Sequence, residues 1–86
     1  MNSSVTRSFR ALFAQLPAEI QALARKNFAL WQRDPHHPSL QFKKIKGRWS
    51  VRVGRDYRAV GLMRQGRLYW YWVGPHDEYE RLIASL

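Results

Sequence analysis

The fold is decided by three short segments: WSVRVG (49–54), YRAVGLM (57–63) and LYWYWV (68–73). In the first of them, apolar residues alternate with Ser50 and Arg52, which is the period-two pattern of a half-buried strand. The connections at 55–56 and 64–67 are short and polar. Strands joined by such short turns pair as antiparallel neighbours. This part of the chain therefore predicts an antiparallel meander.

The flanking segments add a further strand and helices to the meander. LQFKKI (40–45) predicts one more strand, and the turn at 46–48 joins it to the next. Apolar residues recur at helical spacing over 9–16 and again over 17–33, and Asp34-Pro35 ends the second helix. Residues 77–85 predict a short C-terminal helix. The expected fold is α+β: an N-terminal helical hairpin on one face of a meander of three to four strands, in one domain (1–86).

Charge is concentrated in the middle of the chain. The net charge is +9, and residues 41–67 contain Asp56 as their only acidic residue. The basic residues in this segment are Lys43, Lys44, Lys46, Arg48, Arg52, Arg55, Arg58, Arg64 and Arg67. Such a cluster indicates a polyanionic partner, nucleic acid first and an acidic protein second. The alternative is a merely solvated surface, which usually mixes both signs.

The location expected from the sequence is the cytoplasm. The first ten residues lack the apolar stretch of a signal peptide, and no apolar run is long enough to span a membrane. The chain contains no cysteine, which is consistent with a reducing compartment and excludes disulfides and thiolate metal sites. We expect no metal and no cofactor.

Strand alternation predicts which side chains share a face of the sheet. If Val51 and Val53 face the helices, Ser50 and Arg52 face outward, and Arg58 is expected beside Arg52 on an open, cationic face. In the aromatic segment, alternation places Trp70 and Trp72 on one face and Tyr69 and Tyr71 on the other. One pair belongs to the core, and the other is free to stack on bases or a partner. The pattern alone does not decide which.

Three histidines lie outside these strands. His36-His37 is either a metal pair or part of a packed loop, and the spacing matches no zinc pattern, which favours the loop. His76 follows the last strand, and imidazole titrates near neutral pH, so it is the best general acid or base in the chain. Asp77 and Glu78 next to it are expected either to raise its pKa or to orient its ring. The alternative is a polar residue at a helix start, with Asp77 as the cap.

Two stretches together resemble the RelE/ParE superfamily of toxins, most closely the RelE-like cytotoxic translational repressors. They are HPSLQFKKIKGRWSVRVGRDYRAVG (37–61) and WYWVGPHDEYERL (70–82). The resemblance implies the toxin of a type II toxin–antitoxin system, neutralised by a cognate antitoxin. RelE-type members enter the ribosomal A site and cut mRNA without a metal. ParE-type members share the fold and poison DNA gyrase.

The resemblance also implies roles for individual residues. Arg52 matches a basic strand residue of the active face, and Arg58 matches the arginine that contacts the scissile phosphate. His76 falls where relatives carry a catalytic Arg or His, and Tyr79 lies near a functional Tyr. Ser50 departs from the family, because RelE itself has a basic residue there. Pro75-His76 replaces a basic pair, so the identity of the general base stays open.

Metal-independent RNA cleavage needs a base for the 2′-OH, an acid for the 5′-oxygen and cations for the phosphorane charge. Arg52, Arg55 and Arg58 are the candidate cations, because guanidinium grips phosphate oxygens bidentately. Five basic residues of the cluster are expected to bind RNA: Lys43, Lys44, Lys46, Arg48 and Arg55. The leading hypothesis is thus a ribosome-dependent endoribonuclease acting on mRNA. The alternatives are a gyrase inhibitor of the same fold and an RNA-binding module without chemistry.

Overall fold

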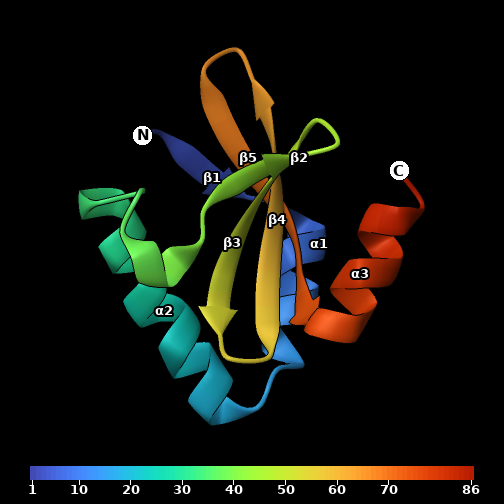
Figure 1. The fold of residues 1–86 in the computed structure, drawn as a ribbon. Coiled ribbons are helices and arrows are strands. Elements are labelled where there is room, and N and C mark those ends of the chain that lie inside the picture. The colour runs from blue at the N-terminus through green and yellow to red at the C-terminus, as the bar shows by residue number, and fades with distance from the viewer.

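The computed structural model describes residues 1–86 as a five-stranded sheet with α-helices on both sides (Figure 1). The strands are β1 (Ser3–Val5), β2 (Lys43–Ile45), β3 (Arg48–Gly54), β4 (Tyr57–Arg64) and β5 (Arg67–Pro75). The helices are α1 (Arg7–Ala14), α2 (Ala18–Arg33) and α3 (His76–Ala84), with a 3-10 turn, η1 (Pro38–Leu40), before β2. The expected α+β fold class is confirmed.

The sheet has the order β1-β5-β4-β3-β2. Strands β2 to β5 form the expected antiparallel meander, and β1 adds a parallel edge strand to β5, with Ser4 opposite Tyr69. The sequence did not predict β1, because a three-residue, mostly polar segment is a strand only through its pairing with β5. The strand expected over 40–45 is shorter, because Gln41 adopts a left-handed backbone (φ 44°) that separates η1 from β2.

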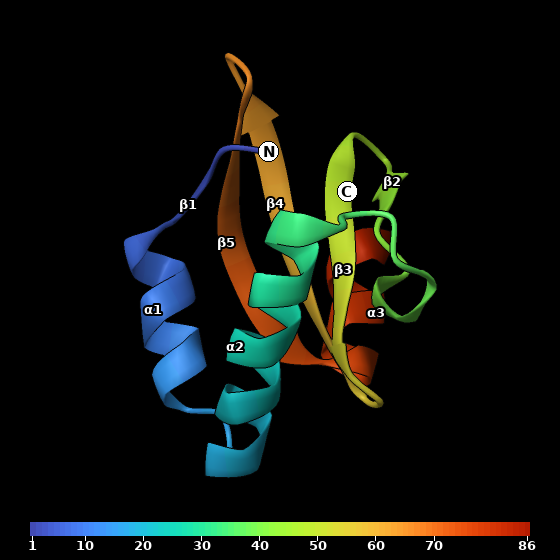
Figure 2. The ribbon, with the colours of Figure 1, turned by 90° about the vertical axis from the view of Figure 1, so that its left-hand side faces the viewer.

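The helices cover the two faces of the sheet unequally. Helices α1 and α2 lie on one face, as expected for the hairpin, and α3 crosses the opposite face (Figure 2). Thr6 caps α1, because its hydroxyl accepts a hydrogen bond from the Phe9 amide at 3.2 Å. The face expected to be open is therefore partly covered by α3. No helix has the length and apolar character that crossing a bilayer requires.

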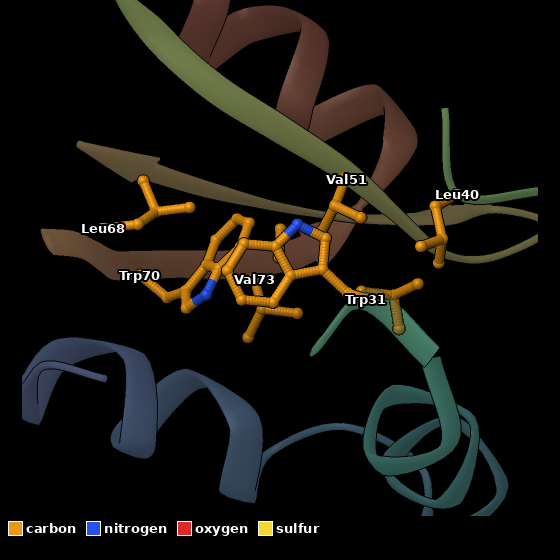
Figure 3. Close-up of a cluster of buried hydrophobic side chains, with 8 residues drawn as sticks. Trp31, Leu40, Val51, Leu68, Trp70 and Val73 are labelled. Atoms are coloured by element: carbon orange, nitrogen blue, oxygen red, sulfur yellow. The ribbon is translucent and has the colours of Figure 1, made fainter. Parts of the chain in front are cut away.

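The main core lies between the sheet and helices α1 and α2. Val51 and Val53 are buried in it, which confirms the predicted orientation of β3. The indoles of Trp31 on α2 and Trp70 on β5 meet edge to face, with ring centroids 5.4 Å apart (Figure 3). Edge-to-face contact is a favoured geometry for aromatic pairs. This contact fixes α2 against the centre of the sheet.

A β-bulge in β5 overturns the predicted alternation of the aromatic run. Val60 of β4 pairs with Trp72, whereas the next residue, Gly61, pairs with Trp70, so Tyr71 is the extra residue. Trp70 therefore belongs to the main core, and Trp72 lies on the α3 face, where its ring is 6.5 Å from that of Tyr79. The expectation that Trp70 and Trp72 share a face is wrong. Because of the bulge, both Tyr71 and Trp72 pack on the α3 side of the sheet.

Candidate active site at the start of helix α3

The four residues predicted to be catalytic, Arg52, Arg58, His76 and Tyr79, lie at one end of the sheet. The turn between β3 and β4 and the start of α3 lie together there (Figure 1). The His76 amide donates to the Asp56 carbonyl at 2.8 Å, which ties α3 to that turn. Arg58 pairs with Arg52 on β3 and with Gly74 on β5. Residues far apart in the sequence are thus brought around the first turn of α3.

Arg58 is buried, with 4% of its surface exposed. Its Nε donates to Ser50 Oγ at 2.8 Å, and its two terminal nitrogens donate to Gln41, at 3.1 Å to the carbonyl and 3.4 Å to Oε1. The Tyr79 ring covers the guanidinium, with its centroid 5.1 Å from Cζ. The predicted face is correct, but the expectation of an open position is wrong, because Arg58 is buried there. Tyr79 of α3 shields the guanidinium from solvent.

No carboxylate neutralises the Arg58 guanidinium. The ion pairs in the structure are His76–Glu80 and Arg81–Asp77, and both lie on the exposed side of α3. Burial lowers the pKa of Arg58 below its ordinary value; Tyr79 partly opposes this effect, and the nearby Arg52 adds to it. A guanidinium nevertheless stays protonated in proteins. The site therefore contains a buried positive charge whose hydrogen-bond partners are all neutral.

His76 is the accessible acid–base group of the site. It is the first residue of α3, and half of its side chain is exposed. Its Nδ1 lies 3.0 Å from Glu80 Oε1, one helical turn further on. The expectation that Asp77 and Glu78 orient the ring is wrong, since Asp77 Oδ1 instead accepts from the Glu78 amide at 2.9 Å. Glu80 thus contacts Nδ1 and leaves Nε2 out of this ion pair.

Tyr79 links His76 to Arg58. Its ring centroid lies 5.6 Å from that of His76, on the side away from the main core. The residue is 5% exposed, so its ring packs between the imidazole and the guanidinium in the smaller core on the α3 side of the sheet. Tyr79 is thus the side chain through which the exposed His76 and the buried Arg58 are in contact.

The other predicted cations divide into two groups. Arg52 is half-buried, with its Nε 3.4 Å from the Gly54 carbonyl. Arg55 is exposed in the adjacent turn, where the neighbouring Asp56 carbonyl accepts from the His76 amide. The remaining four lie toward the opposite end of α3. Lys43 and Lys44 are exposed on the edge strand β2. Lys46 Nζ donates to the Ile83 carbonyl at 3.2 Å, and Arg48 Nε donates to the Tyr71 hydroxyl at 3.1 Å.

Gln41 and Glu80 were not predicted as site residues from the sequence, and the contact of Ser50 with Arg58 was not predicted either. Glu80 was visible as the residue four positions after His76 on a predicted helix, a spacing that brings side chains together. Gln41 carried no signal, because it reaches Arg58 only through its left-handed backbone. Ser50 was noted as a departure from the family pattern, and the structure shows that it is an acceptor for Arg58.

The adjacent histidines of the loop have packing roles. His37 Nδ1 accepts from the Ser39 amide at 3.2 Å and caps η1. The His36 ring packs near Phe42, with centroids 6.1 Å apart. The structure contains no group of three or more His, Asp or Glu side chains placed to hold a metal ion.

Residues 18–81 match the family model of the ParE-like toxin domain. The chain therefore belongs to this family, within the RelE/ParE superfamily of toxins. No protein with a curated description matches the sequence significantly.

Solved structures of the superfamily share the fold. A chain of the RelB–RelE antitoxin–toxin complex from Methanococcus jannaschii has a TM-score of 0.70 at 17% identity, covering 91% of this chain and 95% of that one. The YoeB/ParE toxin from Agrobacterium tumefaciens has a TM-score of 0.66 at 20% identity, covering 88% and 99%. The isolated RelE toxin of Escherichia coli has a TM-score of 0.62 at 11% identity, covering 99% and 98%.

Proposed function

We propose that this protein is the toxin of a toxin–antitoxin pair and that it cleaves mRNA on the ribosome without a metal ion. One observation carries the proposal: a buried arginine without a carboxylate partner and an accessible histidine contact the same tyrosine ring, that of Tyr79. Burying a charge is costly unless it is paired. An anion such as a phosphate would complete the charge balance of Arg58, and His76 is placed to move a proton next to it.

The chemistry follows from the groups present. The 2′-OH attacks the adjacent phosphorus, the bond to the 5′-oxygen breaks, and the products are a 2′,3′-cyclic phosphate and a 5′-OH. His76 Nε2 transfers a proton in this reaction, with its ring held through Nδ1 by Glu80. Arg52 is accessible enough to contact the phosphate oxygens. Arg58 lies beneath Tyr79, so we propose that it stabilises the negative charge of the phosphate at a distance. The sequence had led us to expect direct contact between Arg58 and the phosphate.

Five further basic residues, near the two ends of α3, are proposed to bind RNA. Arg55 stands at the start of α3, and Lys43, Lys44, Lys46 and Arg48 stand toward its end. Contacts between phosphates and Lys or Arg release counterions, so RNA affinity is expected to fall steeply with salt.

The proposed protein partner is an antitoxin with acidic side chains. The net charge of +9 and the cationic α3 face favour such a segment. Similar structures from Methanococcus jannaschii and Pyrococcus horikoshii are antitoxin–toxin complexes of RelB and RelE. Expression of the toxin alone should stop growth, and co-expression of its antitoxin should restore it. Normal growth at high soluble expression would contradict the toxin assignment.

The experiment that tests the reaction is primer extension on mRNA after induction. Cleavage within codons is expected, accompanied by a halt in translation. In a reconstituted assay, cleavage should persist after transition metals are chelated, with magnesium retained to keep ribosomes intact. Intact mRNA after induction would contradict the endonuclease assignment.

Gyrase inhibition is the second candidate, and the match to a ParE-like family model favours it. It requires no acid–base group, so the His76→Ala variant would remain toxic, and gyrase-dependent double-strand breaks would appear while mRNA stays intact. A protein that binds RNA but neither cleaves it nor damages DNA would be the third case, a module without chemistry.

A further inference from the structure

The acceptors around Arg58 form an unusual cradle, because a single residue of the loop supplies two of them. Gln41 offers both its carbonyl, at 3.1 Å, and its side-chain Oε1, at 3.4 Å, to the same guanidinium. Ser50 Oγ, at 2.8 Å, is the third acceptor. The backbone of Gln41 is left-handed (φ 44°, ψ 45°), a conformation that a residue with a Cβ rarely adopts. The loop therefore holds a strained residue at the one position that contacts Arg58 twice.

We propose that Gln41 is a positioning residue: it fixes the Arg58 guanidinium while leaving its positive charge unneutralised for the RNA phosphate. The inference rests on the proposed function, since the anion is the phosphate of the substrate. Gln41 is exposed, whereas Arg58 itself is buried and Tyr79 covers the face of its guanidinium. Residue 41 therefore decides whether the cradle is neutral or anionic.

A negative charge at position 41 distinguishes a positioning role of this residue from a purely structural one. If the cradle served stability alone, Glu at position 41 would serve better, because a carboxylate hydrogen bond to guanidinium is stronger than that of an amide. A carboxylate would also cancel the charge that the substrate is proposed to meet. The inference thus predicts that Gln41→Glu separates the two properties, with stability kept or raised and catalysis lost.

The chain offers a matched control at Gln65. This residue also has a left-handed backbone (φ 50°) and is exposed, but it lies at the tip of the β4–β5 turn, away from the site. Gln65→Glu makes the same change in net charge. Gln41→Gly removes the side-chain acceptor, keeps the carbonyl and relieves the left-handed strain, because glycine adopts positive φ readily.

The test measures single-turnover cleavage of mRNA on ribosomes over a range of toxin concentrations, and the melting temperature of each variant. Gln41→Glu should melt at or above the wild-type temperature, and its maximal rate should fall at least about tenfold, part of the loss seen when one transition-state donor is removed. Its half-saturating concentration should change little. Gln41→Gly should retain more activity than Gln41→Glu, and Gln65→Glu should behave as wild type.

Two outcomes would overturn the inference: a Gln41→Glu protein that cleaves as fast as Gln65→Glu, or one that melts well below it. If the wild type itself cleaves no mRNA, the proposed function fails, and inorganic phosphate then decides the inference. Phosphate should raise the melting temperature of wild type and Gln65→Glu more than that of Gln41→Glu. Equal increases in all three would reject the role of Gln41.

Discussion

Arg52 and Arg58 are cross-strand partners on β3 and β4, so two guanidinium groups project from directly opposite positions on the same side of the sheet. Like charges placed opposite each other destabilise a sheet. Arg58 is also buried and has no carboxylate beside it. The fold therefore maintains two electrostatically unfavourable features at one place. Groups whose charge is disfavoured by burial and by like charges are typical of functional sites, which supports functional roles for Arg52 and Arg58.

Two substitutions of Arg58 should distinguish the effect of its charge on stability from the effect of its volume. Arg58→Met loses the same hydrogen bonds as Arg58→Ala, but it fills most of the volume beneath Tyr79 and removes the uncompensated charge, so it should be clearly more stable than Arg58→Ala. Arg58→Ala leaves the Ser50 hydroxyl without its partner and opens a void, and it should be less stable than wild type by about 1–3 kcal/mol. Both variants should lose cleavage. Urea unfolding and primer extension measure the two properties; an Arg58→Met protein no more stable than Arg58→Ala would count against the argument.

His76 should be essential for the reaction and dispensable for the fold. Its side chain is half exposed, so His76→Ala should unfold like wild type while cleavage falls by about 10²–10⁴-fold, as for loss of a general acid or base. Glu80→Gln weakens the contact that orients the ring and should cause a smaller loss. Asp77→Asn, on the same helical turn, is the control and should leave the rate unchanged. A fully toxic His76→Ala protein would show that the site is misassigned.

Arg52 should contribute to the rate through the phosphate. Arg52→Ala should slow cleavage by about 10²-fold, by analogy with the loss of a single transition-state donor. It also removes the repulsion on Arg58, so stability should be unchanged or slightly increased. Arg64→Ala, an exposed residue near the β4–β5 turn, is the matched control. Equal rates for the two variants would contradict the role of Arg52.

Gly74 should tolerate no side chain. A Cβ placed there would lie 2.8 Å from the Trp72 indole, closer than real Cβ contacts. Gly74→Ala should therefore destabilise the protein by about 1–3 kcal/mol through overpacking. At Gly54 the nearest atom to a new Cβ is the flexible end of Leu23, at 3.3 Å, so Gly54→Ala should cost less. Thermal or urea unfolding compares the two, and equal losses would contradict the close contact.

Antitoxin binding should depend on salt and on the cationic face. Purified toxin should bind its antitoxin more weakly as ionic strength rises, because screening reduces contacts between exposed charges. Lys43→Glu, on the edge strand, should weaken the complex further, and Arg10→Glu on α1 serves as the control of equal charge. Calorimetric titration at two salt concentrations measures both effects. Equal weakening by the two substitutions would show that the antitoxin does not favour the α3 face.

Periodicity predicted most of the fold because it reports local geometry. The helices over 9–16 and 17–33 and the strands β3 to β5 appear close to their predicted positions, since their apolar spacing matches the face that they bury. The bulge at Tyr71 was invisible, because an extra residue in one strand depends on the register with its neighbour. Strand β1 was missed for the same reason, since its pairing partner lies at the other end of the chain.

The sequence by itself determined the α+β class, the family resemblance and the residues from which the site is built, because these depend on side-chain type and local spacing. Only the tertiary structure decided how those residues act. It placed α3 over the expected open face and buried Arg58 beneath Tyr79. It also brought Gln41, without any motif of its own, against the guanidinium. These contacts join segments distant in the chain, and long-range packing is not encoded in any local pattern.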